Sequence, residues 1–152
     1  MTRHELPAGF LFWMVFFRLA CASGVLIAAG VVLYLHFTGE PMNTGDEQML
    51  TILSVTHGVI ALGGWLACAL IPRALLRSIA RSESDDDERW EQALRGLRTA
   101  DLYRLVVLEG PALFGLVICI LAVLGGLMTT QPLFWLNGLS SLAILLYAPL
   151  TL

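Results

Sequence analysis

Residues 102–128 read LYRLVVLEGPALFGLVICILAVLGGLM, and this stretch decides the fold class of the protein. Only two of its side chains are charged, those of Arg104 and Glu109. A helix needs about 20 predominantly apolar residues to cross the hydrocarbon core of a bilayer. The stretch is long enough, so it predicts a membrane-spanning helix that contains a carboxylate.

The rest of the chain has the composition of a membrane protein. Of its 152 residues, 57% are hydrophobic and 14% are charged, whereas about 25% of the residues of a soluble domain are charged. Three further apolar stretches, residues 10–37, 49–72 and 132–150, come close to the required length or exceed it. We therefore predict an all-α integral membrane protein, a single domain over residues 1–152 with four transmembrane helices in two hairpins.

The arginines predict the orientation of these spans. Residues 73–104 contain seven of the nine arginines, and the other two connections contain none. Cytoplasmic loops carry an excess of arginine and lysine, so the connector 73–101 and both termini are expected on the cytoplasmic side. The net charge of −3 reflects an acidic run at residues 82–88 rather than a binding surface, and nucleic acid is not an expected partner.

The connector 73–101 is expected to contain an amphipathic helix. Ser84, followed by acidic residues, is typical of a helix N-cap. Apolar residues then recur at helical spacing at Trp90, Ala93, Leu94, Leu97 and Ala100. The pattern fits either a helix on the membrane surface or an extension of the third span into the cytoplasm.

Small residues predict how the spans pack, because helices in lipid associate where their backbones approach closely. One such face lies on the first span, and a second lies on the second span, so we expect these two faces to meet. Their residues are Ala20, Gly24 and Ala28 on the first span and His57, Ala61, Gly64 and Cys68 on the second.

In the third span, Gly110 and Pro111 predict a helix break. Proline lacks the backbone N–H that a helix requires, and its ring crowds the carbonyl of the residue four positions earlier, which is Val107. A bend or local loosening is expected just after Glu109.

Arg18 and Glu109 are the charged residues furthest inside apolar sequence. Counted inward from His36 and Thr129, they lie about 27 and 30 Å from the outer ends of their spans at about 1.5 Å per residue. Their similar depth predicts an ion pair between the first and third helices. Two alternatives are separate snorkelling of both side chains to the inner interface, and an ion-binding role for the Glu109 carboxylate.

An uncharged polar cluster is expected in the outer half of the membrane. Ser54 and His57 lie on the second span, Asn137 lies on the fourth, and counting inward places His57 and Asn137 about 12 and 9 Å below the surface. A hydrogen bond between His57 and Asn137 is therefore predicted. Imidazole also ligates metals, so His57 could hold haem b or contact a quinone, with His36 as the one candidate for a second haem ligand on that side.

The segment EGPALFGLV, residues 109–117, resembles the carboxylate helix of the proteolipid c subunits of rotary ATP synthases. In that helix an ion-binding acid precedes a pattern of small, aromatic and glycine residues, which Ala112, Phe114 and Gly115 match here at equal offsets from Glu109. The resemblance implies that Glu109 binds a proton or a sodium ion. The chain departs from that family in the irregular glycine spacing of the preceding helix and in two additional spans.

The chain as a whole also resembles small four-helix bacterial membrane proteins with an EGPALFG-type third helix. This resemblance implies the inner (cytoplasmic) membrane of a bacterium and no particular activity.

The predicted function follows from what these patterns contain. No nucleophile with a base at helical spacing, no metal-ligand cluster and no phosphate-binding loop is found, and the three cysteines lie in apolar runs. We therefore expect a structural or accessory subunit of a membrane assembly, homo-oligomeric or part of a larger complex, rather than an enzyme, and no cofactor. The alternatives are translocation of a proton or cation through Glu109, and a haem- or quinone-binding anchor that uses His57.

Overall fold

The computed structural model describes residues 8–40, 46–80 and 86–150, and almost all of them are helical, with no strand in these ranges. The elements are α1 (Ala8–Thr38), α2 (Glu47–Ala80), α3 (Asp86–Leu124), α4 (Leu127–Thr130), the 3₁₀ helix η1 (Pro132–Gly138) and α5 (Leu139–Leu150). Three helices are long and apolar enough to cross a membrane, over Gly9–Thr38, Glu47–Leu75 and Trp90–Leu124. The prediction of an all-helical chain with membrane-like helices is confirmed.

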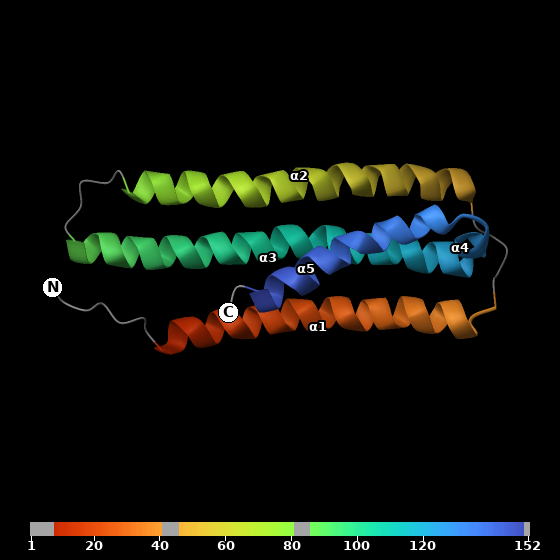
Figure 1. Ribbon diagram of the computed structural model, residues 1–152, viewed down its shortest axis with the longest axis horizontal. Helices are drawn as coiled ribbons and strands as arrows, with labels where there is room; N and C mark the ends of the chain where they lie inside the picture. The colour runs from red at the N-terminus through yellow and green to blue at the C-terminus, as the bar shows by residue number, and fades with distance from the viewer. Residues whose placement is uncertain (1–7, 41–45, 81–85, 151–152) are drawn as a thin grey trace.

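Helix α3 lies at the centre of the fold, between α1 and α2 (Figure 1). Half of its apolar window is buried, against 17% for α1 and 6% for α2. The buried positions of α3 recur every three or four residues, and they form one continuous stripe. It runs through Asp101, Leu105, Leu108, Ala112, Leu116 and Cys119.

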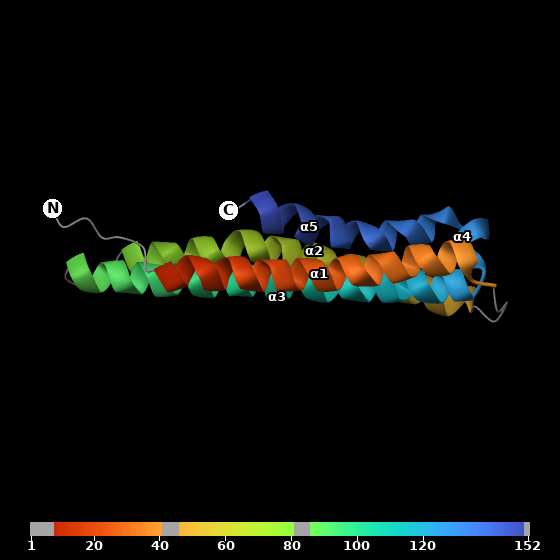
Figure 2. The same cartoon turned by 90° about the horizontal axis from the view of Figure 1, so that it is seen from below.

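The η1–α5 segment forms a second layer across the three long helices (Figure 2). The η1 part packs against α3 and α2, and α5 packs against α3 and α1, so the segment crosses from one groove to the other. The fourth predicted span, residues 132–150, is therefore not one long α-helix. It is a 3₁₀ helix followed by a 12-residue α-helix.

Local sequence explains where the helices begin and end. The Asp46 carboxylate accepts a hydrogen bond from the Met49 amide at 3.0 Å and so caps the start of α2. At the end of α1, a Cβ atom on Gly39 would come 2.5 Å from the Leu35 carbonyl oxygen, so the turn requires glycine. Helix α3 ends at Gly125 and Gly126, where Gly126 adopts φ 72°, a left-handed conformation that favours glycine.

The chain does not leave the helix at Gly110 and Pro111, because α3 continues through both residues to Leu124. Pro111 has no N–H group, so it cannot donate the usual helical hydrogen bond to the Val107 carbonyl. Gly64 of α2 packs at this point, since a Cβ atom there would lie 3.3 Å from the Val107 carbonyl oxygen. The proline therefore marks a close helix contact rather than the end of a helix.

The connector is also corrected by the structure. Within the described parts of residues 73–101 there is no separate surface helix, because α2 extends to Ala80 and α3 begins at Asp86. The apolar positions Trp90 to Ala100 thus belong to the first turns of α3, which is the second of the two predicted arrangements. Ser84, the predicted N-cap, lies outside the described residues.

The small-residue faces of the first two spans do not meet, because α1 and α2 each pack against α3 instead. A Cβ atom on Gly24 of α1 would approach the Glu109 side chain, and one on Gly64 of α2 would approach Val107 and Pro111. Both stripes therefore serve contacts with the central helix.

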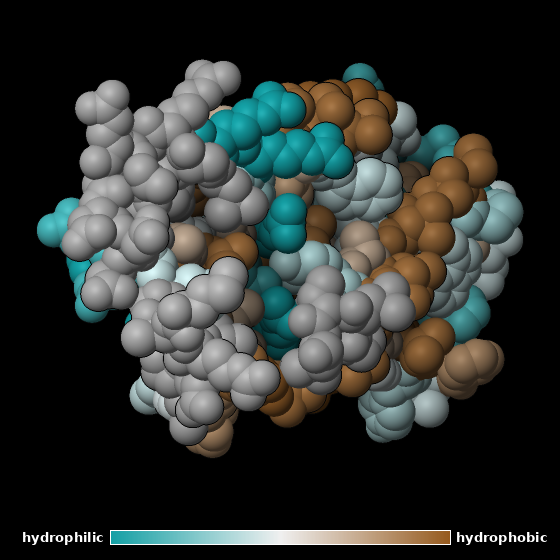
Figure 3. Space-filling model, turned by 60° about the vertical axis from the view of Figure 1, so that its left-hand side comes forward, coloured by the Kyte–Doolittle hydropathy of each residue, from teal (hydrophilic) through white to brown (hydrophobic). Residues whose placement is uncertain are grey.

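The outward faces of α1 and α2 carry many exposed large apolar side chains, as expected of helices surrounded by lipid. Hydrophilic residues gather at the end of the molecule where α1 and α3 begin and α2 ends, beside these apolar flanks (Figure 3). The distribution is that of a bundle with an apolar belt and a polar end.

Candidate functional site

A buried ion pair joins α1 to α3. Arg18 donates from Nη2 to Asp101 Oδ1 at 2.6 Å and from Nε to Asp101 Oδ2 at 3.1 Å. The Tyr147 hydroxyl on α5 donates to the same carboxylate at 2.9 Å, and the Arg18 guanidinium lies 5.7 Å from the centre of the Tyr147 ring. Arg18 and Asp101 are 5% and 6% exposed, so this two-point contact is shielded from solvent.

The predicted ion pair between Arg18 and Glu109 is therefore wrong. The sequence count measured the depth of Glu109 from Thr129, but α3 ends at Leu124, five residues earlier. Glu109 lies eight residues beyond Asp101, which is about 12 Å along the helix axis at 1.5 Å per residue. The carboxylate at the level of Arg18 is that of Asp101.

Glu109 instead faces the small-residue stripe of α1. The side chain is half-buried, and a Cβ atom on Gly24 would lie 4.0 Å from its Oε1 atom. The Cys21 thiol, also on α1, interacts with this carboxylate. Among the residues that the structure describes, no cation lies within ion-pair distance of Glu109.

A second buried cluster joins α2, α3 and η1–α5 around His57. His57 Nδ1 lies 3.0 Å from Asn137 Oδ1, and its Nε2 lies 3.0 Å from both the Pro111 carbonyl oxygen and the Ser140 hydroxyl. Asn137 donates from Nδ2 to the Ser54 hydroxyl at 2.9 Å. The structure thus brings together the predicted residues Ser54, His57 and Asn137.

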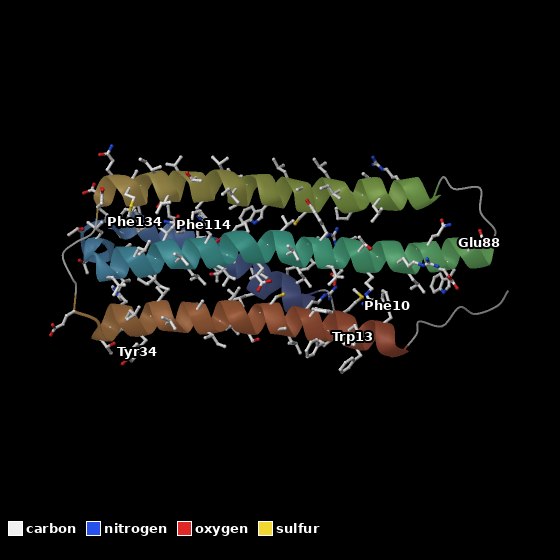
Figure 4. The ribbon with its side chains drawn as sticks, turned by 180° about the vertical axis from the view of Figure 1, so that it is seen from behind. Phe10, Trp13, Tyr34, Glu88, Phe114 and Phe134 are labelled. Atoms are coloured by element: carbon white, nitrogen blue, oxygen red, sulfur yellow. The ribbon has the colours of Figure 1, made fainter. Side chains whose placement is uncertain are left out.

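The close approach of this cluster to α3 depends on Gly115. A Cβ atom at that position would overlap the Asn137 carbonyl oxygen and would come within 2.8 Å of His57 Nε2. Phe114, labelled in Figure 4, lies beside the same ring, with its centroid 5.9 Å from that of His57. Gly115 therefore lets η1 pack directly against α3.

These contacts limit what His57 can bind. Both ring nitrogens are already engaged by protein groups, so ligation of haem iron would require one of these bonds to break. His36, the second ligand considered, packs its ring against Trp135 with centroids 5.2 Å apart. No group of three or more His, Cys, Asp or Glu side chains able to hold a metal ion occurs among the described residues.

A pocket of about 410 Å³ opens beside the His57 cluster, between α2 and the η1–α5 segment. Ser54, His57, Asn137 and Ser140 line its polar side, and Leu62 and Trp65 are among its apolar lining residues. Such a site could receive a flat or chain-like apolar molecule with one polar group.

The sequence alone does not reveal that Asp101 and Tyr147 contact Arg18. It also does not reveal that Ser140 contacts His57. A signal for Asp101 was present, because it shares the helical spacing of Leu105, Leu108 and Ala112, all of which are buried. It was instead assigned to the connector with the other charged residues. Tyr147 gave no comparable signal, because its contact depends on where α5 crosses α3.

Comparisons of the chain with protein families, with curated proteins and with solved structures found no match.

Proposed function

We propose that Glu109 is a reversible proton-binding carboxylate inside the membrane, and that the protein moves protons or small cations through it. One observation carries this proposal. Arg18 forms an ion pair with Asp101, and Glu109 has no cation within ion-pair distance among the described residues. An ionised carboxylate in hydrocarbon is costly unless it is paired with a cation, so a carboxylate without such a partner favours binding a proton or a cation.

The position of Glu109 along the bundle supports the same role. We place the inner edge of the hydrocarbon at the Arg18–Asp101 pair, because the 20 residues from Arg18 to Thr38 span about 30 Å, the thickness of a bilayer core. Glu109 then lies about 12 Å deeper, nearer the middle of the membrane. The resemblance of residues 109–117 to an ion-binding helix agrees with this position.

The membrane topology forms part of the proposal. The η1–α5 segment would span about 32 Å, with about 2.0 Å per residue in η1 and 1.5 Å in α5, which is enough for a fourth crossing. The chain would then form two hairpins in the inner membrane of a bacterium, with both termini and the α2–α3 connection in the cytoplasm. Arg77, Arg95 and Arg98 lie at that end, in agreement with the positive-inside rule.

Proton flux into liposomes tests the function directly. Purified protein is reconstituted into vesicles with a trapped pH-sensitive dye, and flux is driven by a potassium diffusion potential. Glu109→Gln keeps the shape of the protonated side chain but cannot exchange a proton, so flux should fall at least ten-fold. Glu88→Gln is the matched control, because Glu88 is an exposed carboxylate on the same helix that does not line a pocket described below. Equal flux in the wild type and Glu109→Gln would overturn the proposal.

A chemical test examines the protonated state without requiring transport. A hydrophobic carbodiimide adds to a protonated carboxylic acid within lipid, and mass spectrometry locates the adduct. We expect modification at Glu109 and none at Asp101, whose oxygens are held by Arg18 and Tyr147. Modification of Asp101 with Glu109 untouched would contradict the assignment.

The pocket beside His57 favours one second candidate, a site for a quinone-like molecule. Its lining is largely apolar and has hydrogen-bonding groups on one side, as such a molecule requires. Extraction of the purified protein with organic solvent and chromatography of the extract would identify a bound quinone. Ala61 also lines the pocket, so an Ala61→Trp variant should fill it and lose the quinone.

A role as an accessory subunit or homo-oligomer remains a prediction. The mass of the detergent-solubilised particle, measured by light scattering, tests it.

A further inference from the structure

We propose that the groove between the first turns of α1 and the cytoplasmic part of α3 binds the phosphate of an anionic phospholipid. The inference rests on the membrane placement proposed above, but not on the role of Glu109. It starts from a pocket of about 410 Å³ at the polar end of the bundle. Phe10 and Trp13 line it from α1, and Leu94, Arg95 and Arg98 are among the residues that line it from α3.

The pocket lies at the level of lipid head groups. Arg98 is three residues before Asp101, so it is about 4.5 Å further toward the cytoplasm than the Arg18–Asp101 pair that marks the edge of the hydrocarbon. Trp13, which Figure 4 shows at the same end of α1 as Phe10, is 48% exposed and lies beside exposed phenylalanines. Tryptophan is enriched at this boundary, where one part of the ring meets lipid and the other meets water.

The charges of the pocket are suited to a phosphate. No hydrogen bond or ion pair joins Arg98 to any residue that the structure describes. Arg95 is bonded to Glu91 at 2.8 Å, but these side chains are 78% and 70% exposed. A pair that exposed contributes little, so Arg95 is available to a stronger anion. Two arginines spaced by three residues lie on one side of α3 and can contact one phosphate together.

The surroundings of the pocket favour a phospholipid over a free anion. The exposed aromatic side chains of α1 continue from Trp13 through Phe16 and Phe17 to the edge of the hydrocarbon at Arg18. Beyond that edge α1 exposes further apolar side chains, among them Leu19 and Leu26, along which acyl chains can lie while the phosphate occupies the polar end. Basic pockets between helices on the cytoplasmic side bind anionic lipid head groups in this way.

Lipid preference can be measured by quenching of tryptophan fluorescence. Brominated phosphatidylglycerol or brominated phosphatidylcholine is titrated into vesicles that contain the protein. To isolate the signal of Trp13, the other three tryptophans are replaced by phenylalanine. With two arginines contributing, we expect the anionic lipid to be preferred about 10- to 30-fold over the zwitterionic lipid. An equal preference for both lipids would overturn the proposal.

Variants locate the preference. Arg98→Gln should reduce it about five-fold, and Arg95→Gln with Arg98→Gln should abolish it. Arg77→Gln is the matched control, because Arg77 is exposed at the same end of the bundle but belongs to α2 and does not line the pocket. An equal loss in Arg77→Gln would show a general surface effect and would contradict the assigned site.

Two further measurements keep the proposal open to refutation. Glu91→Gln removes the competing carboxylate, so it should strengthen the preference for phosphatidylglycerol, and weaker binding would contradict the argument. Inorganic phosphate at 50-fold excess should not displace the lipid, whereas displacement would assign the pocket to a free anion. Proton flux is measured separately from lipid preference. Failure of the Glu109 proposal can therefore be distinguished from failure of the phospholipid proposal.

Discussion

The ion pair between Arg18 and Asp101 supports the most decisive prediction of stability. Arg18→Gln leaves the Asp101 carboxylate buried without the Arg18 guanidinium, and Asp101→Asn leaves the buried guanidinium without the Asp101 carboxylate. Breaking a buried pair by removing one partner costs about 3–5 kcal/mol. Two charge-assisted hydrogen bonds of about 1.5–3 kcal/mol each give a total of the same size. Little solvent screening reduces this cost, because both side chains are at most 7% exposed.

A double-mutant cycle separates the pair from the other contacts of each residue. The variant with both substitutions removes both charges, so it should be clearly less destabilised than the sum of the single variants. We expect a coupling energy of about 3 kcal/mol between Arg18 and Asp101. A parallel cycle with Arg18→Gln and Glu109→Gln should give less than about 0.5 kcal/mol, as for residues that share no contact.

The free energies of unfolding can be measured in mixed micelles. The protein is unfolded with increasing SDS in dodecylmaltoside and followed by far-UV circular dichroism, with reversibility checked by dilution. A coupling below about 1 kcal/mol between Arg18 and Asp101 would refute the buried ion pair between these two residues. If the coupling of Arg18 with Glu109 were larger than that with Asp101, Arg18 would contact Glu109 instead. The proposal that Glu109 binds a proton would then lose its basis.

Three further predictions concern glycines and an exposed ion pair. Gly115→Ala should destabilise the protein by about 1–3 kcal/mol, because the added methyl group overlaps the Asn137 backbone. Gly110→Ala is the control and should not destabilise the protein, because a Cβ atom there meets nothing within 4 Å. Equal unfolding free energies for the two variants would count against the packing of η1 on α3. Gly126→Ala should cost about 1 kcal/mol, because φ 72° is unfavourable with a side chain, and an unchanged unfolding midpoint would argue against that turn. Arg95→Gln should change the unfolding free energy by less than about 0.5 kcal/mol, since its partner is exposed; a change above 1 kcal/mol in the same assay would be incompatible with a surface pair.

Much of the candidate site could be predicted from single positions and their spacing. Polar residues in apolar stretches are few and expensive, so Arg18, Glu109, His57 and Asn137 stand out without any structure. The contact between His57 and Asn137 could also be anticipated. Both residues lie about two turns from the outer ends of their spans, and those ends are marked by polar loops.

The assignment of partners failed where the ends of the helices were wrong. Glu109 was placed at the depth of Arg18 because the third span was counted from Thr129, while Gly126 ends α3 in a left-handed turn after Leu124. A shift of five residues is about 7.5 Å, which is more than half of the axial distance of about 12 Å between Asp101 and Glu109. Asp101 was overlooked for a related reason, since it was counted with the charges of the connector rather than with the buried stripe of α3.

By itself, the sequence determined that the chain is helical and apolar enough for a membrane, because hydropathy and length are local properties that do not depend on which helices touch. It also determined which residues are unusual there. Only the tertiary structure decided that α3 is central, that α1 and α2 contact it rather than each other, and that η1–α5 crosses between them. Small residues show that a helix face packs closely but not against which partner. The pairing of Arg18 with Asp101, which leaves Glu109 without a cation among the described residues, follows from that arrangement.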